Sequence, residues 1–230
     1  MGEYWKKYNK KLNKFAALMS AYNSKNEFNF IENNFYNHIR DLVALSISLI
    51  EINSRRESAS SIKILDYGSN ITTWSNIIRK INTDLIEITI FDPFFDPEES
   101  LNDIGLSINI VNQEESLISE KFDLTIFGSC AQYNKNFFLD LKSKNSYLGK
   151  YVLFTHTPLS LGESFMSKQF SDYTGMQNVH SYQDVSEIFK QLSYKLLFKS
   201  TLPPEGASVE KKYIKKTVYA NLLFVKNDFL

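Results

Sequence analysis

The chain has 230 residues, enough for a single domain with a sizeable core, and its 26 basic and 26 acidic side chains balance to a formal net charge of zero. That balance argues against nucleic acid as the main partner, because binding to phosphate backbones usually needs a basic face. With 43% hydrophobic and 23% charged residues, the composition is that of a soluble globular protein.

The remaining composition points to the cytoplasm. A single cysteine, Cys130, allows no intrachain disulfide. The longest apolar run, residues 42–50, is too short for a membrane span, and no signal-type hydrophobic core follows the basic N-terminus. We therefore expect a cytoplasmic protein without a membrane partner. The richness in Asn, Lys and Ile is typical of AT-rich bacterial coding.

The first 60 residues are predicted to form a helical cap in front of the main fold. Apolar residues recur at helical spacing over residues 3–22 and from about Ile31 to Ile52. A polar linker over 53–61 follows them. The two helices are expected either to close over a ligand or to form a homodimer interface, and the sequence leaves both readings open.

The main domain is predicted over residues 61–230, where strand and helix patterns alternate. Strands are expected at 62–66, 86–91, 106–111, 122–127 and 150–155, and helices at 71–82, 98–104, 135–144 and 182–192. Two further strand patterns, 194–200 and 217–225, are expected to pair antiparallel at the sheet edge. This order predicts an α/β fold with a doubly wound sheet and one reversed strand.

Two strands that each end on an acidic residue make the most informative pattern. The segment from Ile64 to Asn70 includes Asp66 and Gly68, and the next strand ends on Asp92, 26 positions after Asp66. Such a βαβ unit places a nucleoside-type ligand at the carboxyl ends of its strands, with the second acid on the ribose. The plain alternatives are a ligand-free turn at Gly68 and an ordinary Asp-Pro turn at Asp92; the pairing favours binding.

The glycine pattern separates two cofactor families. A dinucleotide fingerprint needs further glycines, but Asn70 and Thr72 stand there, so the match to a dehydrogenase is poor. Asp-x-Gly followed by an acidic end to the second strand instead resembles the class I S-adenosylmethionine (SAM) methyltransferases. The segment from Phe122 to Tyr133 is similar to the fourth motif of that family, whose strand end faces the methyl donor.

This resemblance implies a Rossmann-like, seven-stranded sheet with a reversed last strand, and SAM as the cofactor. Asp66 and Gly68, with Ser69 and Asn70, would line the methionine part, and Asp92 with Pro93 would hold the ribose. Ser129 and Cys130, at the end of the fourth strand, would face the methyl donor. Phe94 would enclose the adenine, although aromatic residues are more often plain core. Gln113 would contact the adenine, and a solvated loop is an equal alternative.

A narrower resemblance covers roughly residues 60–200. The segment from Leu153 to Leu159, then Phe165 and Gln169, then residues 182–189, look like methyltransferases found among bacterial surface-polysaccharide (capsule or O-antigen) genes. It implies O-methylation of a carbohydrate or of a phosphate-type group linked to a sugar, and a cytoplasmic enzyme that binds a small-molecule or carbohydrate substrate.

Four residues are candidates for the chemistry. His156, at the end of the fifth strand beside Pro158, is a candidate general base, and a packed loop histidine is an equal alternative. Tyr133 follows the fourth strand into the same crevice. Gln169 is expected to orient a sugar hydroxyl, with an exposed helix residue as the alternative. His180 lies in a predicted polar loop over 172–180 that would act as a substrate lid, although an exposed loop histidine is favoured there.

The competing functions are a catalytically inactive binding or scaffold protein and a nicotinamide-dependent oxidoreductase. The altered glycine pattern favours the first of these rivals and disfavours the second. No residues recur at metal-ligand spacing, so no metal is expected. Four lysines, Lys211, Lys212, Lys215 and Lys216, form a basic run. This run is either a solvated connection or a contact for a phosphate-bearing substrate.

Overall fold

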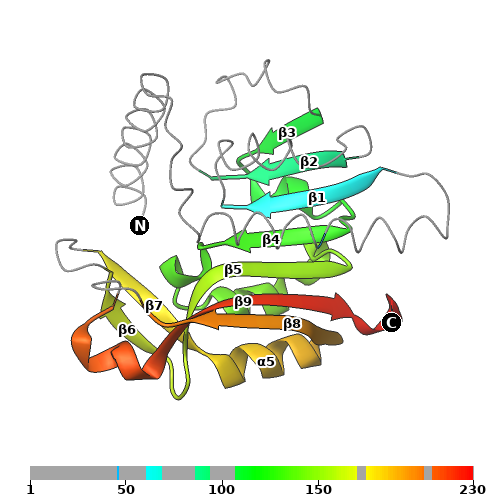
Figure 1. Cartoon of the computed structure of the whole chain (residues 1–230). Coiled ribbons are helices and arrows are strands. Elements are labelled where there is room, and N and C mark those ends of the chain that lie inside the picture. The colour runs from blue at the N-terminus through cyan, green and yellow to red at the C-terminus, as the bar shows by residue number, and fades with distance from the viewer. Residues whose placement is uncertain are drawn as a thin grey trace, which may run out of the picture.

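The computed structural model describes Ser46 and residues 61–68, 86–93, 107–169, 175–204 and 209–229. Seven strands form the main sheet in the spatial order β3-β2-β1-β4-β5-β9-β8 (Figure 1). In chain order they are β1 (Ile62–Tyr67), β2 (Ile86–Phe91), β3 (Ser107–Val111), β4 (Leu124–Gly128), β5 (Tyr151–Ser160), β8 (Tyr194–Leu202) and β9 (Thr217–Lys226).

Six of these strands, β8 included, run in the same direction, and only the last one, β9, is reversed. Strands β3, β2, β1, β4 and β5 run in the same direction, and β9 is antiparallel to both of its neighbours, β5 and β8. This arrangement confirms the predicted α/β, Rossmann-like sheet with a reversed last strand. The predicted strand ends agree with the structure to within two residues, except at the carboxyl end of β5.

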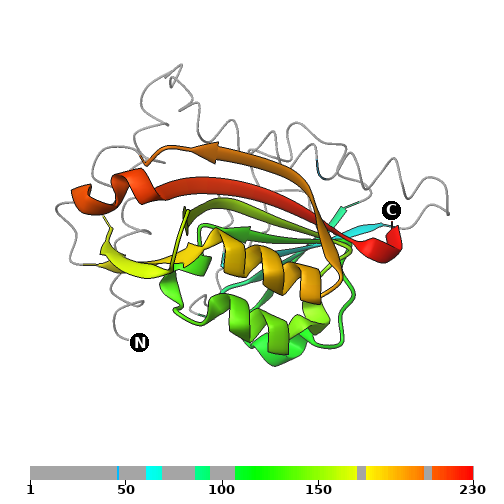
Figure 2. The same cartoon turned by 90° about the horizontal axis from the view of Figure 1, so that it is seen from below.

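Both faces of the sheet are buried, as expected for a mainly parallel sheet. The consecutive β1 residues Ile64 and Leu65 point to opposite faces, and both are fully buried. One face is covered by α4 (Phe137–Ser143) and α5 (Tyr182–Gln191), which lie on the same side of the sheet in Figure 2. These two helices match the patterns predicted at 135–144 and 182–192.

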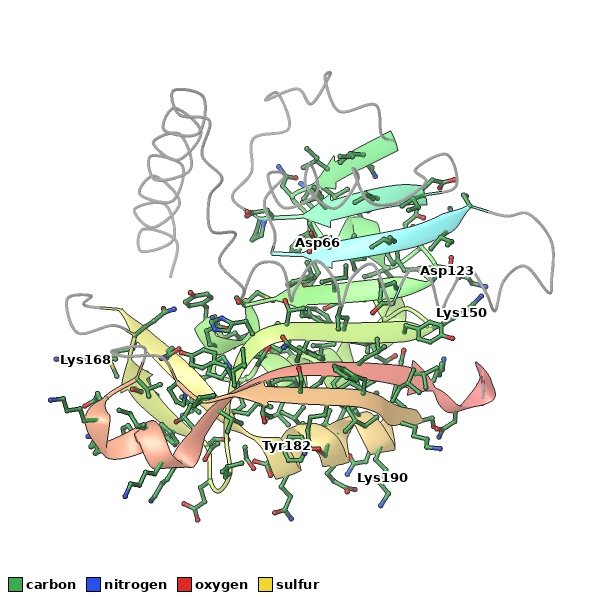
Figure 3. All side chains as sticks on the ribbon, viewed as in Figure 1. Asp66, Asp123, Lys150, Lys168, Tyr182 and Lys190 are labelled. Carbon is green, nitrogen blue, oxygen red and sulfur yellow. The ribbon has the colours of Figure 1, made fainter. Side chains whose placement is uncertain are left out.

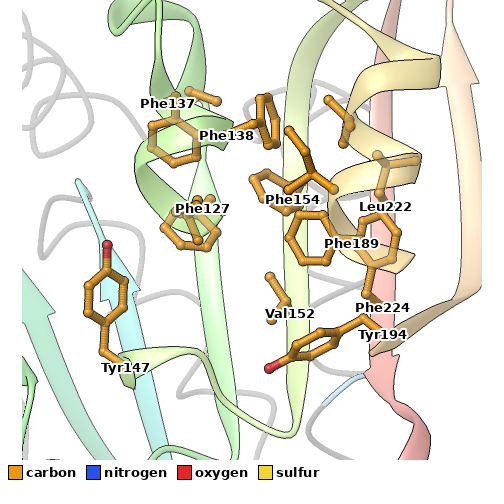
Figure 4. Close-up of a cluster of buried hydrophobic side chains, with 14 of the residues drawn as sticks. Phe127, Phe137, Phe138, Tyr147, Val152, Phe154, Phe189, Tyr194, Leu222 and Phe224 are labelled. Carbon is orange, nitrogen blue, oxygen red and sulfur yellow. The ribbon is translucent and has the colours of Figure 1, made fainter. Parts of the chain in front are cut away.

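Aromatic rings fill the layer between the sheet and these helices (Figure 4). Phe154 of β5 stacks on Phe127 of β4 at 4.9 Å and meets Phe189 of α5 edge-on at 5.5 Å. Each such pair contributes about 0.5–1.5 kcal/mol beyond its buried area. The helix α5 begins where the Ser181 hydroxyl accepts a hydrogen bond from the Asp184 amide, and the apolar face of α5 then packs on β5. This packing fixes β4 and β5 in their register.

A hairpin that the sequence did not predict adjoins β5. Strand β5 continues to Ser160, five residues past the predicted end, and pairs with β7 (Met176–Ser181) at Leu159 and Ser160. Strand β6 (Phe165–Lys168) pairs antiparallel with β7. The predicted loop over 172–180 is therefore wrong for residues 176–180, which are strand. Pro158 lies inside β5 because, between the pairings with β4 and β7, only β9 pairs with β5.

Several predictions lie outside the described residues. They include the helices at 3–22, 71–82 and 98–104 and the binding residues Ser69, Asn70 and Phe94. The N-terminal cap over 1–60 and the dimer interface that it would provide also stay predictions, although Ser46 is helical and buried within the segment expected to be helix. None of the described helices has the length and apolar character needed to cross a membrane.

Candidate active site

The carboxyl ends of the parallel strands meet at one edge of the sheet. Tyr67, the last residue of β1, pairs with Phe91 of β2 and Phe127 of β4. The residues that follow, Gly68, Asp92 and Gly128, therefore lie side by side, and Ser129 comes directly after Gly128. Figure 3 shows Asp66 at this end of the sheet and Asp123 with Lys150 at the opposite end. A crevice at this edge is where open α/β sheets bind their ligands.

Gly68 makes a turn that a side chain would crowd. Its φ of +74° is in the left-handed region, and its amide donates a 2.7 Å hydrogen bond to the Phe91 carbonyl. A Cβ on Gly68 would lie 3.0 Å from the Cβ of Cys130. Glycine is therefore required twice, by the backbone angle and by the close approach of β4. The structure thus brings Gly68 and Cys130 together.

The acids at this edge differ in burial. Asp66 is 3% exposed, whereas Asp92 is only half-buried and continues the β2 strand by donating its amide to the Val111 carbonyl at 3.2 Å. Pro93 follows it on the surface. Asp92 therefore stands at the end of β2, where a ribose-binding acid is expected.

Gln113 is exposed just after β3, where it precedes the 3₁₀ helix η2 (Glu114–Leu117). Its neighbour Glu114 is held from three sides. One carboxylate oxygen accepts hydrogen bonds from the hydroxyls of Tyr67 at 3.1 Å and Tyr147 at 2.9 Å, and the other pairs with Lys144 at 2.7 Å. Burial acts to raise the pKa of the Glu114 carboxyl, but these donors outweigh it and the pKa is lowered. The Glu114 anchor fixes the chain beside Gln113.

Ser129 and His156 form the centre of the site. Both residues have left-handed backbones, with φ values of +50° and +48°. The Ser129 hydroxyl lies 3.4 Å from the His156 Nδ1 and 3.4 Å from the His156 carbonyl oxygen. Non-glycine residues in this region cost about 1–3 kcal/mol each and concentrate at functional sites. Ser129 directly follows β4, whereas His156 lies inside β5, just beyond the last residue that pairs with β4, and not at the strand end that we expected. These two adjacent left-handed residues make this edge the candidate site.

The His156 ring is half-buried. It stacks on the Tyr219 ring of β9, with centroids 4.2 Å apart and an interplanar angle of 17°. Burial lowers the pKa of His156 to about 4, so the imidazole is neutral at physiological pH. The thiol of Cys130 is neutral too, because burial and then the Asp66 carboxylate raise its pKa. That thiol is therefore not a nucleophile at neutral pH.

Tyr133 and Gln169 come together across the hairpin. Tyr133 ends the 3₁₀ helix η3 (Ala131–Tyr133), which follows Cys130, and Gln169 follows β6. The Gln169 Nε2 donates a 3.2 Å hydrogen bond to the Tyr133 hydroxyl, and both side chains are half-buried. Gln169 is thus not the exposed helix residue of the alternative reading. The two residues form a polar wall between η3 and the hairpin.

His180 does not lie in the polar loop that we expected, and it is not the exposed loop histidine of the alternative reading either. It is buried in β7, where its Nε2 donates to the Ala131 carbonyl at 3.1 Å and its ring meets Phe138 edge-on. Asn178, two residues earlier, donates to the Gln132 carbonyl at 3.0 Å. Together they tie η3 to the hairpin. The substrate role of His180 stays a prediction.

Sequence reasoning missed Asn221 and Tyr219, which contact His156 from β9. Asn221 is 2% exposed and accepts the His156 amide. An Asn in the middle of the apolar strand β9 was the available signal, because a buried polar residue needs a partner. Among the described residues, no group of three or more His, Cys, Asp or Glu side chains is placed to hold a metal ion.

No family model and no curated protein sequence matches the chain. Among solved structures, the fold is similar to a 1,6-didemethyltoxoflavin N1-methyltransferase of Burkholderia thailandensis, solved with bound 1,6-didemethyltoxoflavin and S-adenosylhomocysteine. The TM-score is 0.52 at 14% identity, over 94% of this chain and 90% of that one. A magnesium protoporphyrin IX methyltransferase of Synechocystis PCC 6803 has a TM-score of 0.47 at 12% identity, over 86% and 88% of the two chains. The likeness to the Burkholderia enzyme shows that the chain shares the Rossmann-like fold of that methyltransferase.

Proposed function

We propose that the protein is a SAM-dependent methyltransferase that binds SAM at the carboxyl ends of β1, β2 and β4. The observation that carries this proposal is the side-chain-free turn at Gly68 against Cys130, with Asp92 at the end of the next strand. The methyltransferase fold supports it, and so does the S-adenosylhomocysteine bound to the Burkholderia relative.

The charges at this edge suit a sulfonium cation. Asp66 and Asp92 supply carboxylates, and the pKa of about 4 keeps His156 uncharged at neutral pH. A protonated imidazole here would repel the sulfonium, whereas a neutral one does not. The charges of this edge, as well as its shape, therefore suit SAM.

The protein would then promote methyl transfer mainly by aligning the methyl donor with the acceptor. SAM supplies an activated methyl group, so the protein must orient the acceptor and exclude water. An acceptor hydroxyl becomes strongly acidic as its oxygen bonds to the methyl carbon. The neutral His156 imidazole, although a weak base, is sufficient to take that proton at the end of the displacement. Tyr133, fixed by Gln169, would position the acceptor by hydrogen bonding.

For the acceptor we propose a carbohydrate or sugar-linked phosphate-type group of surface polysaccharide. Support comes from five exposed lysines around the hairpin, namely Lys168, Lys211, Lys212, Lys215 and Lys216. The 3₁₀ helix η5 (Lys211–Lys216) attaches to the hairpin where Tyr213 stacks on Phe165 at 4.1 Å. Glu210 pairs with Lys212 at 3.4 Å, which leaves a local excess of positive charge. Such a surface attracts an anionic substrate.

A thermal-shift series with SAM, S-adenosylhomocysteine and NAD tests the cofactor. At 100 times its dissociation constant a ligand adds about 2.7 kcal/mol, or about 5–10 °C for a chain of this size. We expect a rise with the two adenosyl ligands alone. A rise with NAD alone would favour an oxidoreductase. No rise at all would contradict the proposal and favour a scaffold protein.

The acceptor proposal has its own test. Phosphorylated and neutral sugars are compared as methyl acceptors with labelled SAM, for the wild type and a variant with Lys211, Lys212, Lys215 and Lys216 all changed to Gln. We expect activity on the phosphorylated sugars that falls in the variant, with SAM binding unchanged. Equal activity of wild type and variant would remove the lysines from the proposal.

A further inference from the structure

The backbone at His156 is a β-bulge with a single residue opposite it. In the pairing of β5 with β9, Phe154 faces Leu222 and Thr157 faces Ala220. Two residues of β5, Thr155 and His156, therefore stand opposite Asn221 alone. A bulge of this kind takes one residue out of the ladder and redirects its side chain.

The bulge creates two costs at His156. Its φ of +48° is unfavourable for a residue with a Cβ, and its amide lies where the regular ladder pairing is interrupted. A buried amide without an acceptor would cost about 1–3 kcal/mol. The conformation therefore persists only if neighbouring groups hold it.

Asn221 meets this need directly. Its side-chain Oδ1 accepts the His156 amide at 2.9 Å, and its Nδ2 donates to the Ser200 hydroxyl of β8 at 3.0 Å. The residue is 2% exposed, so its orientation is fixed by these partners. Tyr219, two residues away on β9, supplies the ring on which the imidazole stacks.

We propose that Asn221 is the positioning residue of the active site: its side chain holds the β5 bulge and so places the His156 ring between Ser129 and Tyr219. The functional meaning rests on the proposed function, in which His156 faces the methyl acceptor. The effect of Asn221 on the conformation of His156 follows from the hydrogen bonds alone and can be tested without any cofactor.

The test uses the ring protons of His156 in NMR spectra. Because the imidazole stacks on Tyr219, the ring current of Tyr219 moves its proton signals upfield in the wild type. The chain has three histidines, and a His156→Gln variant identifies the signals of this one. In Asn221→Leu, which has a similar volume but no acceptor, we expect the signals to return toward ordinary positions.

Two further variants separate positioning from general damage. Thr217 also lies on β9, is 2% exposed like Asn221, and donates its hydroxyl to the Tyr213 carbonyl. Thr217→Val removes this hydroxyl and should leave the His156 signals unchanged. Asn221→Asp keeps an oxygen that accepts the His156 amide, and should also retain the upfield signals, even if Asn221→Leu fails to fold.

The outcomes are distinct. Unchanged His156 signals in Asn221→Leu, or loss of the upfield signals in Asn221→Asp, would overturn the proposal. A separate experiment adds S-adenosylhomocysteine to the wild-type protein. A shift of the His156 signals on this addition supports the proposed function. If S-adenosylhomocysteine causes no shift, the cofactor site is contradicted, but the role of Asn221 is unaffected.

Discussion

Gly68 and Cys130 approach so closely that a side chain at the turn after β1 would be crowded: a Cβ on Gly68 would lie 3.0 Å from the Cβ of Cys130. The contact joins the ends of two strands that are 62 positions apart in the sequence (130 − 68). It also leaves the Gly68 backbone, which is exposed, as the surface presented at the candidate site.

Replacing Gly68 by Ala should therefore cost both stability and cofactor binding. The left-handed φ alone is unfavourable for Ala by about 1–2 kcal/mol, and the contact with Cys130 adds to it. Urea unfolding measures the first effect and S-adenosylhomocysteine titration the second. Gly162→Ala is the control, since a Cβ there meets nothing within 4 Å. Equal stability of the two variants would contradict this account of the turn.

Replacing Asp92 by Asn should weaken S-adenosylhomocysteine binding. A hydrogen bond to a charged group contributes about 1.5–3 kcal/mol, so the affinity should fall about tenfold to a hundredfold. Calorimetric titration measures this fall.

Asp123→Asn is the matched control for Asp92. Asp123 lies at the other end of the sheet, where it accepts the Lys63 amide at 3.0 Å and pairs with Lys150 at 3.1 Å. This variant should lose stability and keep its affinity. The Asp92 assignment fails if both variants bind equally well.

The stability should depend on pH through His156. Because burial lowers its pKa from 6.5 to about 4, the folded state binds fewer protons than the unfolded state in this range. The contribution of His156 to the free energy of unfolding is complete above pH 6.5 and is lost as the pH falls toward 4. Between pH 7.5 and 4.5 it amounts to about 2–3 kcal/mol.

The His156→Gln variant isolates this contribution. Burial, opposed by hydrogen bonds to backbone carbonyls, also lowers the pKa of His180, so both proteins must be unfolded in urea at the two pH values and their difference taken. The stability advantage of the wild type should shrink in acid. A constant difference would show that His156 titrates normally.

Glu114 should be worth more to stability than an ordinary surface carboxylate. Tyr67, Tyr147 and Lys144 all donate to it, so Glu114→Gln should cost about 1–3 kcal/mol at pH 7. Because its folded pKa is lowered, the contribution is present above pH 4.5 and declines as the pH falls through the folded value.

Exposed Glu120, 3.9 Å from Lys63, provides the comparison. Glu120→Gln should change the free energy of unfolding by less than about 0.5 kcal/mol. A double-mutant cycle of Glu114→Gln with Tyr147→Phe then measures the coupling directly. Full additivity in that cycle would mean that the hydroxyl and the carboxylate do not interact.

The sequence predicted where the main strands lie along the chain because hydrophobic runs and turn residues are local signals. It missed the continuation of β5 through Pro158, since a proline usually ends a strand. Here Pro158 lies where β4 no longer pairs with β5, and it is tolerated. The β6–β7 hairpin was missed because its polar residues, such as Gln177 and Asn178, look like a loop.

The site could be predicted only as a set of strand ends. Gly68 and Cys130 were both named, but their contact depends on the register of β1 against β4. The bulge at His156 depends on Asn221, 65 positions later, and no local pattern reports such a pairing. Asn221 in an apolar strand was a visible anomaly, and local rules are broken most often where a residue has a special role.

A crystal structure of the protein grown with S-adenosylhomocysteine tests the central claim most directly. The account predicts the ligand at the carboxyl ends of β1, β2 and β4, with its ribose on Asp92 and its homocysteine part against the Gly68 backbone and Ser129. A ligand bound elsewhere, or crystals that take up none at saturating concentration, would contradict a SAM site at this edge of the sheet.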